Sequence, residues 1–259
     1  MKKIFTLLFL SIISFNIFAQ KEDLRSMMKE RNEFYFNFEI DDIQQLNKIA
    51  NIISIDNVDG NKITAYANNK QYERFLTLGI ETTLLTPPSM LENHKMFDGR
   101  TRAEYDWDQY PTYEAYEAMM EEFSEDYSEY CTLIDLGTLN SGRKLLVARI
   151  NNGETEGKPK FFYSSTIHGD ETTGFIMMLR LIETLLTQQD LPEVKNVLDN
   201  IDLFIAPNTN PDGTYHGGNH TVNGATRSNA YGVDMNRNYP DPIDGPHPDG
   251  EDYAYETEL

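Results

Sequence analysis

The chain has 259 residues, enough for one large domain and a smaller one. It carries 42 Asp and Glu against 22 Lys and Arg. The resulting net charge of -20 argues against nucleic acid or an anionic membrane as a partner, because both would repel such a surface. A single cysteine, Cys131, excludes an intramolecular disulfide and a cysteine-based metal knuckle. We expect it to be a buried small hydrophobe.

The first 19 residues have the pattern of a secretory signal peptide. Two lysines precede an apolar run over residues 4–18, and Ala19 is a small residue at the expected cleavage point. The run is short for a membrane-spanning helix. We therefore expect residues 1–19 to be removed, so that the mature chain begins near Gln20 and is secreted, to the extracellular space or the periplasm.

Residues 20–86 are predicted to form a small βαββαβ module with the ferredoxin-like arrangement. Apolar and polar residues alternate from Phe34 to Ile40, which indicates a strand with one buried face. Asp59-Gly60 predicts a hairpin turn. Nothing in this module suggests chemistry, so a structural or regulatory role is expected. Its other predicted elements are a helix through Leu46 and Ile49, strands 52–55 and 63–66, a helix 71–78 and a strand 81–85.

Residues 87–104 are predicted to be a linker, because they combine two prolines, glycine and charge with little periodicity. A second domain, residues 105–259, then alternates strands with helices. This alternation predicts an α/β fold with a mixed sheet and flanking helices. Arg143, in a turn between two strands, is expected to be a surface residue. The predicted elements are a helix from Thr112, strands 131–136 and 144–151, a buried strand from Phe161, a helix face over 175–186 and a strand 201–206.

The clearest indication of chemistry is the turn His168-Gly169-Asp170-Glu171, which joins the Phe161 strand to the next helix. Open α/β sheets place their ligand sites at the carboxyl ends of strands. A neutral imidazole and a carboxylate are both zinc ligands, and two ligands from one tight turn can converge on a single ion. In the alternative interpretation, Asp170 caps the helix and His168 is a polar residue of an exposed loop.

Two later segments carry groups suited to binding a carboxylate. They are Asn-Pro-Asp-Gly at 210–213 and Gly-Val-Asp-Met-Asn-Arg-Asn-Tyr-Pro at 232–240. Arg237 offers a planar fork of donors for bidentate capture, and Asn236 beside it can donate from its amide. Arg227 is a second cation in the same region. The alternative is that Asn236 and Arg237 only tie the loop down by pairing with Asp234 or Asp241.

Together, these three segments resemble the funnelin-type zinc carboxypeptidases over about residues 110–259. The resemblance implies a secreted bacterial zinc enzyme that hydrolyses the C-terminal peptide bond of peptides and proteins. It also implies that residues 20–86 are similar to an activation segment, or pro-domain. By position, His168 and Glu171 resemble the first two zinc ligands, Arg227 the arginine that polarises the scissile carbonyl, and Asn236 and Arg237 the pair that holds the terminal carboxylate.

The chain departs from the family pattern in three places. Asp170 stands where pancreatic-type members usually have an arginine. The loop from Arg227 to Asn236 is shorter than in those enzymes and resembles the loop of the family's regulatory branch. The family takes its third zinc ligand, a histidine, and its catalytic glutamate from segments well beyond the Asn-Arg pair. We expect both beyond Leu259, and therefore expect an incomplete reading frame. The remaining histidines, none of which stands at the third ligand's position, are His94, His216, His220 and His247.

The mechanism implied by the resemblance is metal-assisted hydrolysis. Zinc held by two histidines and a glutamate lowers the pKa of its bound water towards ~7, and a glutamate removes the proton. Two alternatives stay open: a cell-wall peptide amidase of the same family, and a noncatalytic exported peptide-binding module. The acidic stretch 241–252 offers hard oxygen ligands for calcium through Asp241, Asp244 and Asp249, but its prolines and irregular spacing favour a solvated loop.

Overall fold

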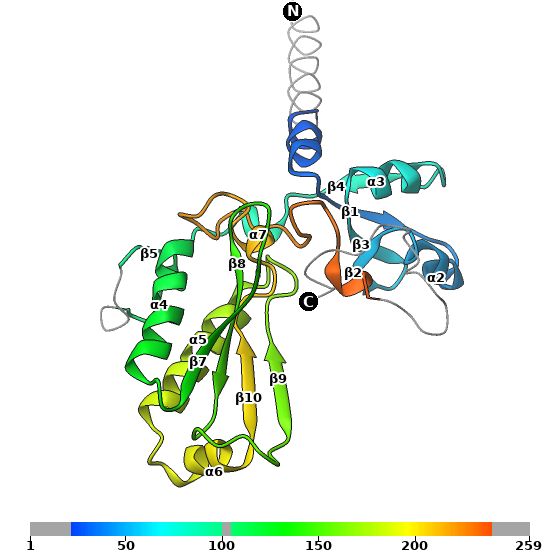
Figure 1. Cartoon of the computed structure of the whole chain (residues 1–259). Coiled ribbons are helices and arrows are strands. Elements are labelled where there is room, and N and C mark those ends of the chain that lie inside the picture. Colours follow the sequence, from blue (N-terminus) through cyan, green and yellow to red (C-terminus); the bar gives the residue numbers. More distant parts are fainter. Residues whose placement is uncertain (1–21, 100–104, 240–259) are drawn as a thin grey trace, which may run out of the picture. The chain divides into compact units, whose positions relative to one another are not determined.

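The computed structural model describes residues 22–99 and 105–239 (Figure 1). The predicted signal peptide and the acidic stretch 241–252 lie outside these residues. The chain divides into two compact units between Pro87 and Pro88. Over the two described ranges, every helix is too short or too polar to cross a membrane.

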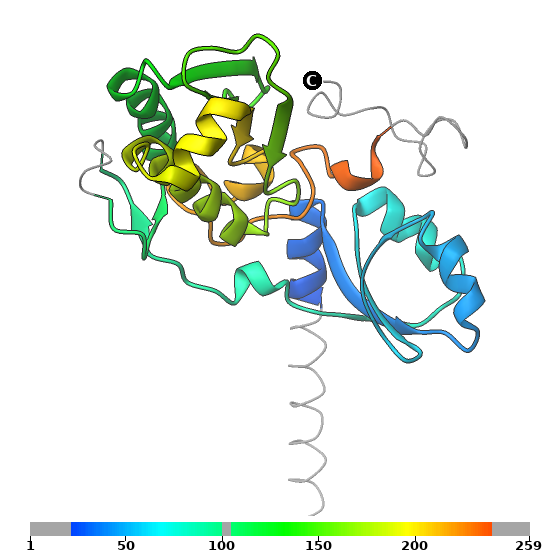
Figure 2. The ribbon, with the colours of Figure 1, turned by 90° about the horizontal axis from the view of Figure 1, so that it is seen from below.

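The first unit is a four-stranded antiparallel sheet with strand order β2-β3-β1-β4. Its strands and helices follow one another in the predicted βαββαβ order, after a helical segment over residues 22–31. The helices pack on one face of the sheet (Figure 2). The elements are β1 (Phe34–Glu39), η1 (Ile43–Gln45), α2 (Leu46–Ile49), β2 (Ser54–Asp59), β3 (Lys62–Ala67), α3 (Asn69–Leu76) and β4 (Thr82–Leu84).

Local sequence explains this unit. The alternating phenylalanines of β1, from Phe34 to Phe38, are buried against the helices, as their period of two requires. Gly60 adopts a φ of 62° in the predicted hairpin, a conformation that favours glycine. Asn68 and Gln71 form a reciprocal capping box at the start of α3.

The second unit contains a mixed sheet with strand order β7-β8-β10-β9, in which only the β10–β9 pairing is parallel. Helices α4 and α5 cover one face and form the main core with it (Figure 1). Helix α6 was not predicted. The elements are β6 (Tyr110–Pro111), α4 (Tyr113–Asp126), β7 (Cys131–Thr138), β8 (Lys144–Ile150), β9 (Lys160–Ser164), α5 (Thr172–Thr187), α6 (Pro192–Asn200), β10 (Asp202–Ala206), α7 (Pro211–Thr214) and η4 (Met235–Arg237).

The predicted linker has structure in its described part. It contains a turn of helix, η2 (Pro88–Met90), and a short strand, β5 (Met96–Phe97), which pairs with β6. The Ser89 hydroxyl donates to the carbonyl of Ala225 at 2.6 Å. This segment is therefore attached to the second unit, an attachment that composition alone does not indicate.

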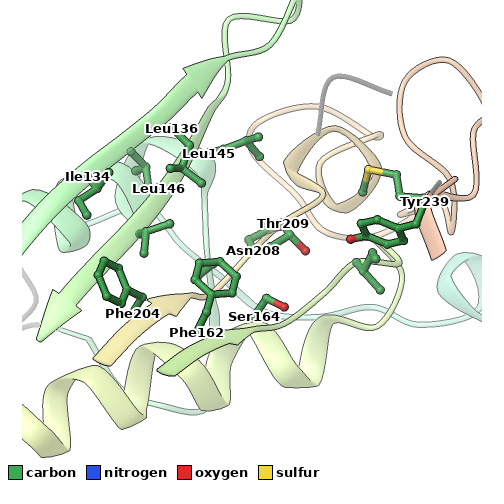
Figure 3. A pocket seen from close by; sticks show the side chains of 14 residues that line it. Ile134, Leu136, Leu145, Leu146, Phe162, Ser164, Phe204, Asn208, Thr209 and Tyr239 are labelled. Atoms are coloured by element: carbon green, nitrogen blue, oxygen red, sulfur yellow. The ribbon is translucent and has the colours of Figure 1, made fainter. Parts of the chain in front are cut away.

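Strand β9 corrects one prediction, because it is exposed rather than buried. Phe161 and Phe162 are each 54% exposed and Tyr163 is 44% exposed. The reason is topological: β9 is an edge strand of the described sheet, with β10 as its neighbour there. On the sheet face opposite α5, Phe162 and side chains of β7, β8 and β10 line an apolar cavity of about 440 Å³ (Figure 3).

Candidate metal centre

The backbone around the turn 168–171 has two unusual features, a left-handed residue before the turn and a close contact at Gly169. Thr166, which precedes it, has a φ of 59°, a left-handed conformation that is strained for a β-branched residue. At Gly169, a Cβ would lie 2.3 Å from the carbonyl carbon of Gly213, so only glycine allows these two backbones to meet. Helix α5 begins at Thr172, and the residue before it, Glu171, makes no side-chain cap.

His168 contacts a carboxylate with each of its ring nitrogens. Nδ1 lies 2.9 Å from Oε1 of Glu171, and Nε2 lies 3.2 Å from Oδ1 of Asp234. His168 is 5% exposed, whereas the side chain of Glu171 is 61% exposed. The alternative interpretation, in which His168 is a polar residue of an exposed loop, is therefore wrong.

Asp234 joins this turn to Arg227. Its Oδ2 accepts a hydrogen bond of 2.9 Å from Nε of Arg227, and its Oδ1 also accepts from the backbone N–H of Asn236 at 3.0 Å. Burial opposes the charge on His168, but its contacts with the carboxylates of Asp234 and Glu171 together raise the pKa of the imidazole above its usual value. Burial also lowers the pKa of Arg227, but the carboxylates of Asp234, Asp170 and Glu171 together raise it above its usual value.

Asn236 and Arg237 lie on η4, which Asp234 caps. Both side chains are exposed. The Arg237 guanidinium donates to the carbonyl of Asn236 at 3.1 Å. The alternative in which these residues pair with Asp234 holds for the backbone N–H of Asn236 but not for Arg237, because that carboxylate is engaged by Arg227 and His168. Asp241, the other suggested partner, lies outside the described residues.

The donors of the turn fit a zinc ion in kind. A metal-ligating histidine ordinarily donates its second ring N–H to a carboxylate, which fixes the tautomer and leaves the other nitrogen for the metal. Asp234 is placed to accept from Nε2 of His168, so Nδ1 is the nitrogen that faces Glu171. Within residues 22–99 and 105–239, however, no three His, Cys, Asp or Glu side chains converge in a way that could hold a metal.

None of the other described histidines contacts this pair, although His94 lines the same pocket as Glu171. His94 contacts Glu92 at 2.6 Å, and His216 and His220 are exposed on the loop after α7. His247 lies outside the described residues. Arg143, predicted to be a surface turn residue, is instead paired with the buried Asp212 at 2.8 Å. That prediction was wrong because the partner lies 69 residues away in the chain.

Sequence reasoning missed two residues that organise the site. The sequence suggested Asp234 only as a partner that ties the loop down, although it lies within the 232–240 motif that was singled out. Asn210 was not assigned a contact, yet its side-chain amide bonds the carbonyls of Ile167 and Arg227. Neither role follows from spacing in the chain, because each depends on segments that meet in the folded protein.

The second unit is thus an α/β domain in which the His168–Glu171 turn follows an edge strand of the described sheet. A family profile described as zinc carboxypeptidase matches residues 116–257. The chain belongs to this family.

Individual relatives agree with the family assignment. Carboxypeptidase SOL1 of Arabidopsis thaliana is 33% identical over 135 residues, which cover 51% of this chain and 26% of that protein. Human carboxypeptidase D is 35% identical over 132 residues, which cover 48% of this chain and 9% of that protein. The chain thus spans about a quarter or less of these two relatives.

Solved structures show the same fold. Carboxypeptidase A from Helicoverpa armigera superposes with a TM-score of 0.58 at 19% identity, over 88% of this chain and 64% of that one. Thrombin activatable fibrinolysis inhibitor superposes with a TM-score of 0.53 at 18% identity, over 80% and 59%. The predicted mixed α/β fold is therefore confirmed.

Proposed function

We propose that this chain contributes part of the active site of a secreted zinc metallocarboxypeptidase that removes C-terminal residues from peptides and proteins. The observation that carries the proposal is His168, which faces Glu171 with one ring nitrogen and the buried Asp234 with the other. In this proposal His168 and Glu171 hold Zn²⁺. The ion, when bound, lowers the pKa of a water molecule and polarises the substrate carbonyl.

The chain's own residues divide the remaining work. Asp234 accepts the Nε2–H of His168 and keeps Nδ1 directed at Glu171. Arg227, held by the same carboxylate, stabilises negative charge that develops on the carbonyl oxygen. The exposed Asn236 and Arg237 bind the terminal carboxylate of the substrate, since the Arg237 fork has no carboxylate partner among the described residues.

The third zinc donor and the general base come, in this proposal, from residues outside 22–99 and 105–239. Two protein ligands leave an ion bound mainly by water. We therefore expect a chain limited to residues 22–239 to bind zinc weakly and to lack hydrolytic activity. Loss of the general base would by itself reduce the rate by about 10²- to 10⁴-fold.

The substrate assignment is tested with the protein expressed from its complete natural gene. Free and carboxyl-amidated versions of one peptide are compared, and only the free peptide should be cleaved efficiently. Arg237→Ala should weaken binding of the free peptide by about 2 to 5 kcal/mol, because a carboxylate is then left without its partner. Equal cleavage of both peptides would contradict the proposal. Binding of free peptides without any cleavage would favour the noncatalytic peptide-binding module.

Secretion and processing form a separate part of the proposal. Export rests on the two lysines, the apolar run 4–18 and Ala19. The test is amino-terminal sequencing of exported material, which should begin at or near Gln20. Exported protein that retains Met1 would show that no signal peptide is removed. A pro-domain role for residues 20–86 predicts that their proteolytic removal raises activity.

A further inference from the structure

The candidate centre has two halves, the turn 168–171 and the segment that carries Arg227, which come from distant parts of the chain. The turn 168–171 follows β9, whereas Arg227 belongs to the segment before η4. For Asp234 to bridge His168 and Arg227, the backbones that carry them must stay at a fixed separation. The turn at 210–213, which the sequence singled out but the proposed mechanism does not use, lies between them.

Asn210 bonds both halves with one amide group. Its Nδ2 donates to the carbonyl of Ile167 and to the carbonyl of Arg227, each at 3.2 Å. Its Oδ1 accepts from the backbone N–H of Gly213 at 2.9 Å. Asn210 is completely buried. Both amide hydrogens and the amide oxygen are thus used, and a flipped amide would oppose its oxygen to two carbonyls.

The surrounding backbones leave no room for adjustment. Gly169 donates its N–H to the carbonyl of Arg227 at 3.2 Å, the same carbonyl that accepts from Asn210. Thr226 donates to the carbonyl of Gly213 at 2.9 Å. A Cβ at Gly213 would lie 2.7 Å from the carbonyl oxygen of Ser228. Three chain segments therefore meet backbone to backbone around one buried amide.

We propose that Asn210 is a positioning residue that sets the separation between the His168 turn and Arg227. It contacts neither the metal nor the substrate, and acts through the carbonyls of Ile167 and Arg227. The inference rests on the proposed function for its consequence in catalysis. Its structural core, that Asn210 holds two segments together, can be tested without metal or substrate.

The test is hydrogen exchange on the metal-free chain, read at the amide of Gly169. Asn210→Asp keeps the size and an oxygen but replaces the two donors with a carboxylate. Losing two buried hydrogen bonds should accelerate exchange at Gly169 by about 10- to 100-fold. The amides of β10, which report global unfolding, should change much less. If Asn210→Asp does not fold, Asn210→Ser carries the same measurement.

A control variant in the same turn distinguishes a local positioning effect at Gly169 from a general loss of stability of the unit. Asp212→Asn breaks the ion pair with Arg143, but Asp212 has no hydrogen bond to Ile167 or Arg227 in the described structure. It should destabilise the unit while Gly169 keeps its exchange rate relative to β10. The proposal is overturned if Gly169 exchanges at the wild-type rate in the folded Asn210 variants, or if Asp212→Asn accelerates it equally.

Cobalt(II) titration of the protein from its complete natural gene gives the functional consequence. Asn210→Asp should weaken cobalt binding by about 10- to 100-fold and alter the visible spectrum, whereas Asp212→Asn should do neither. Unchanged cobalt affinity and spectrum in Asn210→Asp would overturn the positioning role. A wild-type protein that binds no cobalt would contradict the proposed function, and the exchange result would still decide the structural claim.

Discussion

Asp234→Asn should destabilise the second unit more than any substitution of an exposed charge. Asp234 is 2% exposed and Arg227 is 7% exposed, and they are joined at 2.9 Å. Removing one partner of a buried ion pair costs about 3 to 5 kcal/mol, because the other charge stays buried. Asparagine keeps one acceptor for the N–H of Asn236, so we expect a value near the lower end.

The assay is thermal unfolding followed by the fluorescence of Trp107, the chain's one tryptophan, which lies in the second unit. A loss of about 3 kcal/mol corresponds to a fall in Tm of about 6 to 12 °C for a unit of this size. The matched control is Asp199→Asn, which removes an exposed ion pair with Lys195 and should leave the unfolding midpoint nearly unchanged. A shift in Asp234→Asn no larger than the control's would refute the reasoning.

Three further predictions concern the sheet of the second unit. The hydrogen bond from Arg149 lowers the pKa of the buried Asp202, so this pair adds stability above about pH 4 that is lost as pH falls through the lowered pKa. Asp202→Asn should therefore be less stable than wild type at pH 7, with a difference that shrinks in acid. Burial raises the pKa of Cys131 to about 12, so thiol reagents at pH 8 should modify it slowly until urea is added. Phe162→Glu should reduce binding of the dye ANS and slow aggregation, because Phe162 lies on an exposed edge strand beside an apolar cavity.

Each of these predictions has an opposing result. A difference between wild type and Asp202→Asn that is constant from pH 7 to pH 2 would show that the pair contributes through packing. Native Cys131 reacting as fast as a free thiol would contradict its burial. For Phe162, the control is Met177→Glu, at a residue 63% exposed on α5 and outside the cavity. Equal loss of dye binding in both variants would mean that the cavity is not the binding surface.

Much of the fold could be predicted from local sequence. The βαββαβ order, the hairpin at Asp59-Gly60 and the helix that follows Thr112 each depend on residues that are neighbours in the chain. The exposure of β9 could not be predicted in this way. Aromatic and β-branched residues mark a strand, but whether Phe161 is covered depends on which strand lies beside it. The prediction that Arg143 is a surface residue was wrong for a related reason, because its partner Asp212 is distant in the sequence.

For the candidate site, the sequence indicated which residues to consider but not which contacts they make. His168, Glu171 and Arg227 were singled out by residue type and motif. In the structure His168 and Arg227 both contact Asp234, and Glu171 contacts His168. The role of Asp234 could not be derived, because an aspartate in a loop motif is compatible with capping, pairing or exposure. Asn210 is a similar case, since its two acceptors are backbone carbonyls and leave no pattern of residue types in the sequence.

The most direct test of the account is the zinc content of the protein expressed from its complete natural gene and purified without chelators. The account predicts about one zinc per molecule in the wild type and loss of that zinc in His168→Ala. It predicts full retention in His220→Ala, because His220 is exposed on the loop after α7 and lines a different pocket. Stoichiometric zinc in His168→Ala would contradict the central claim that the 168–171 turn holds the metal.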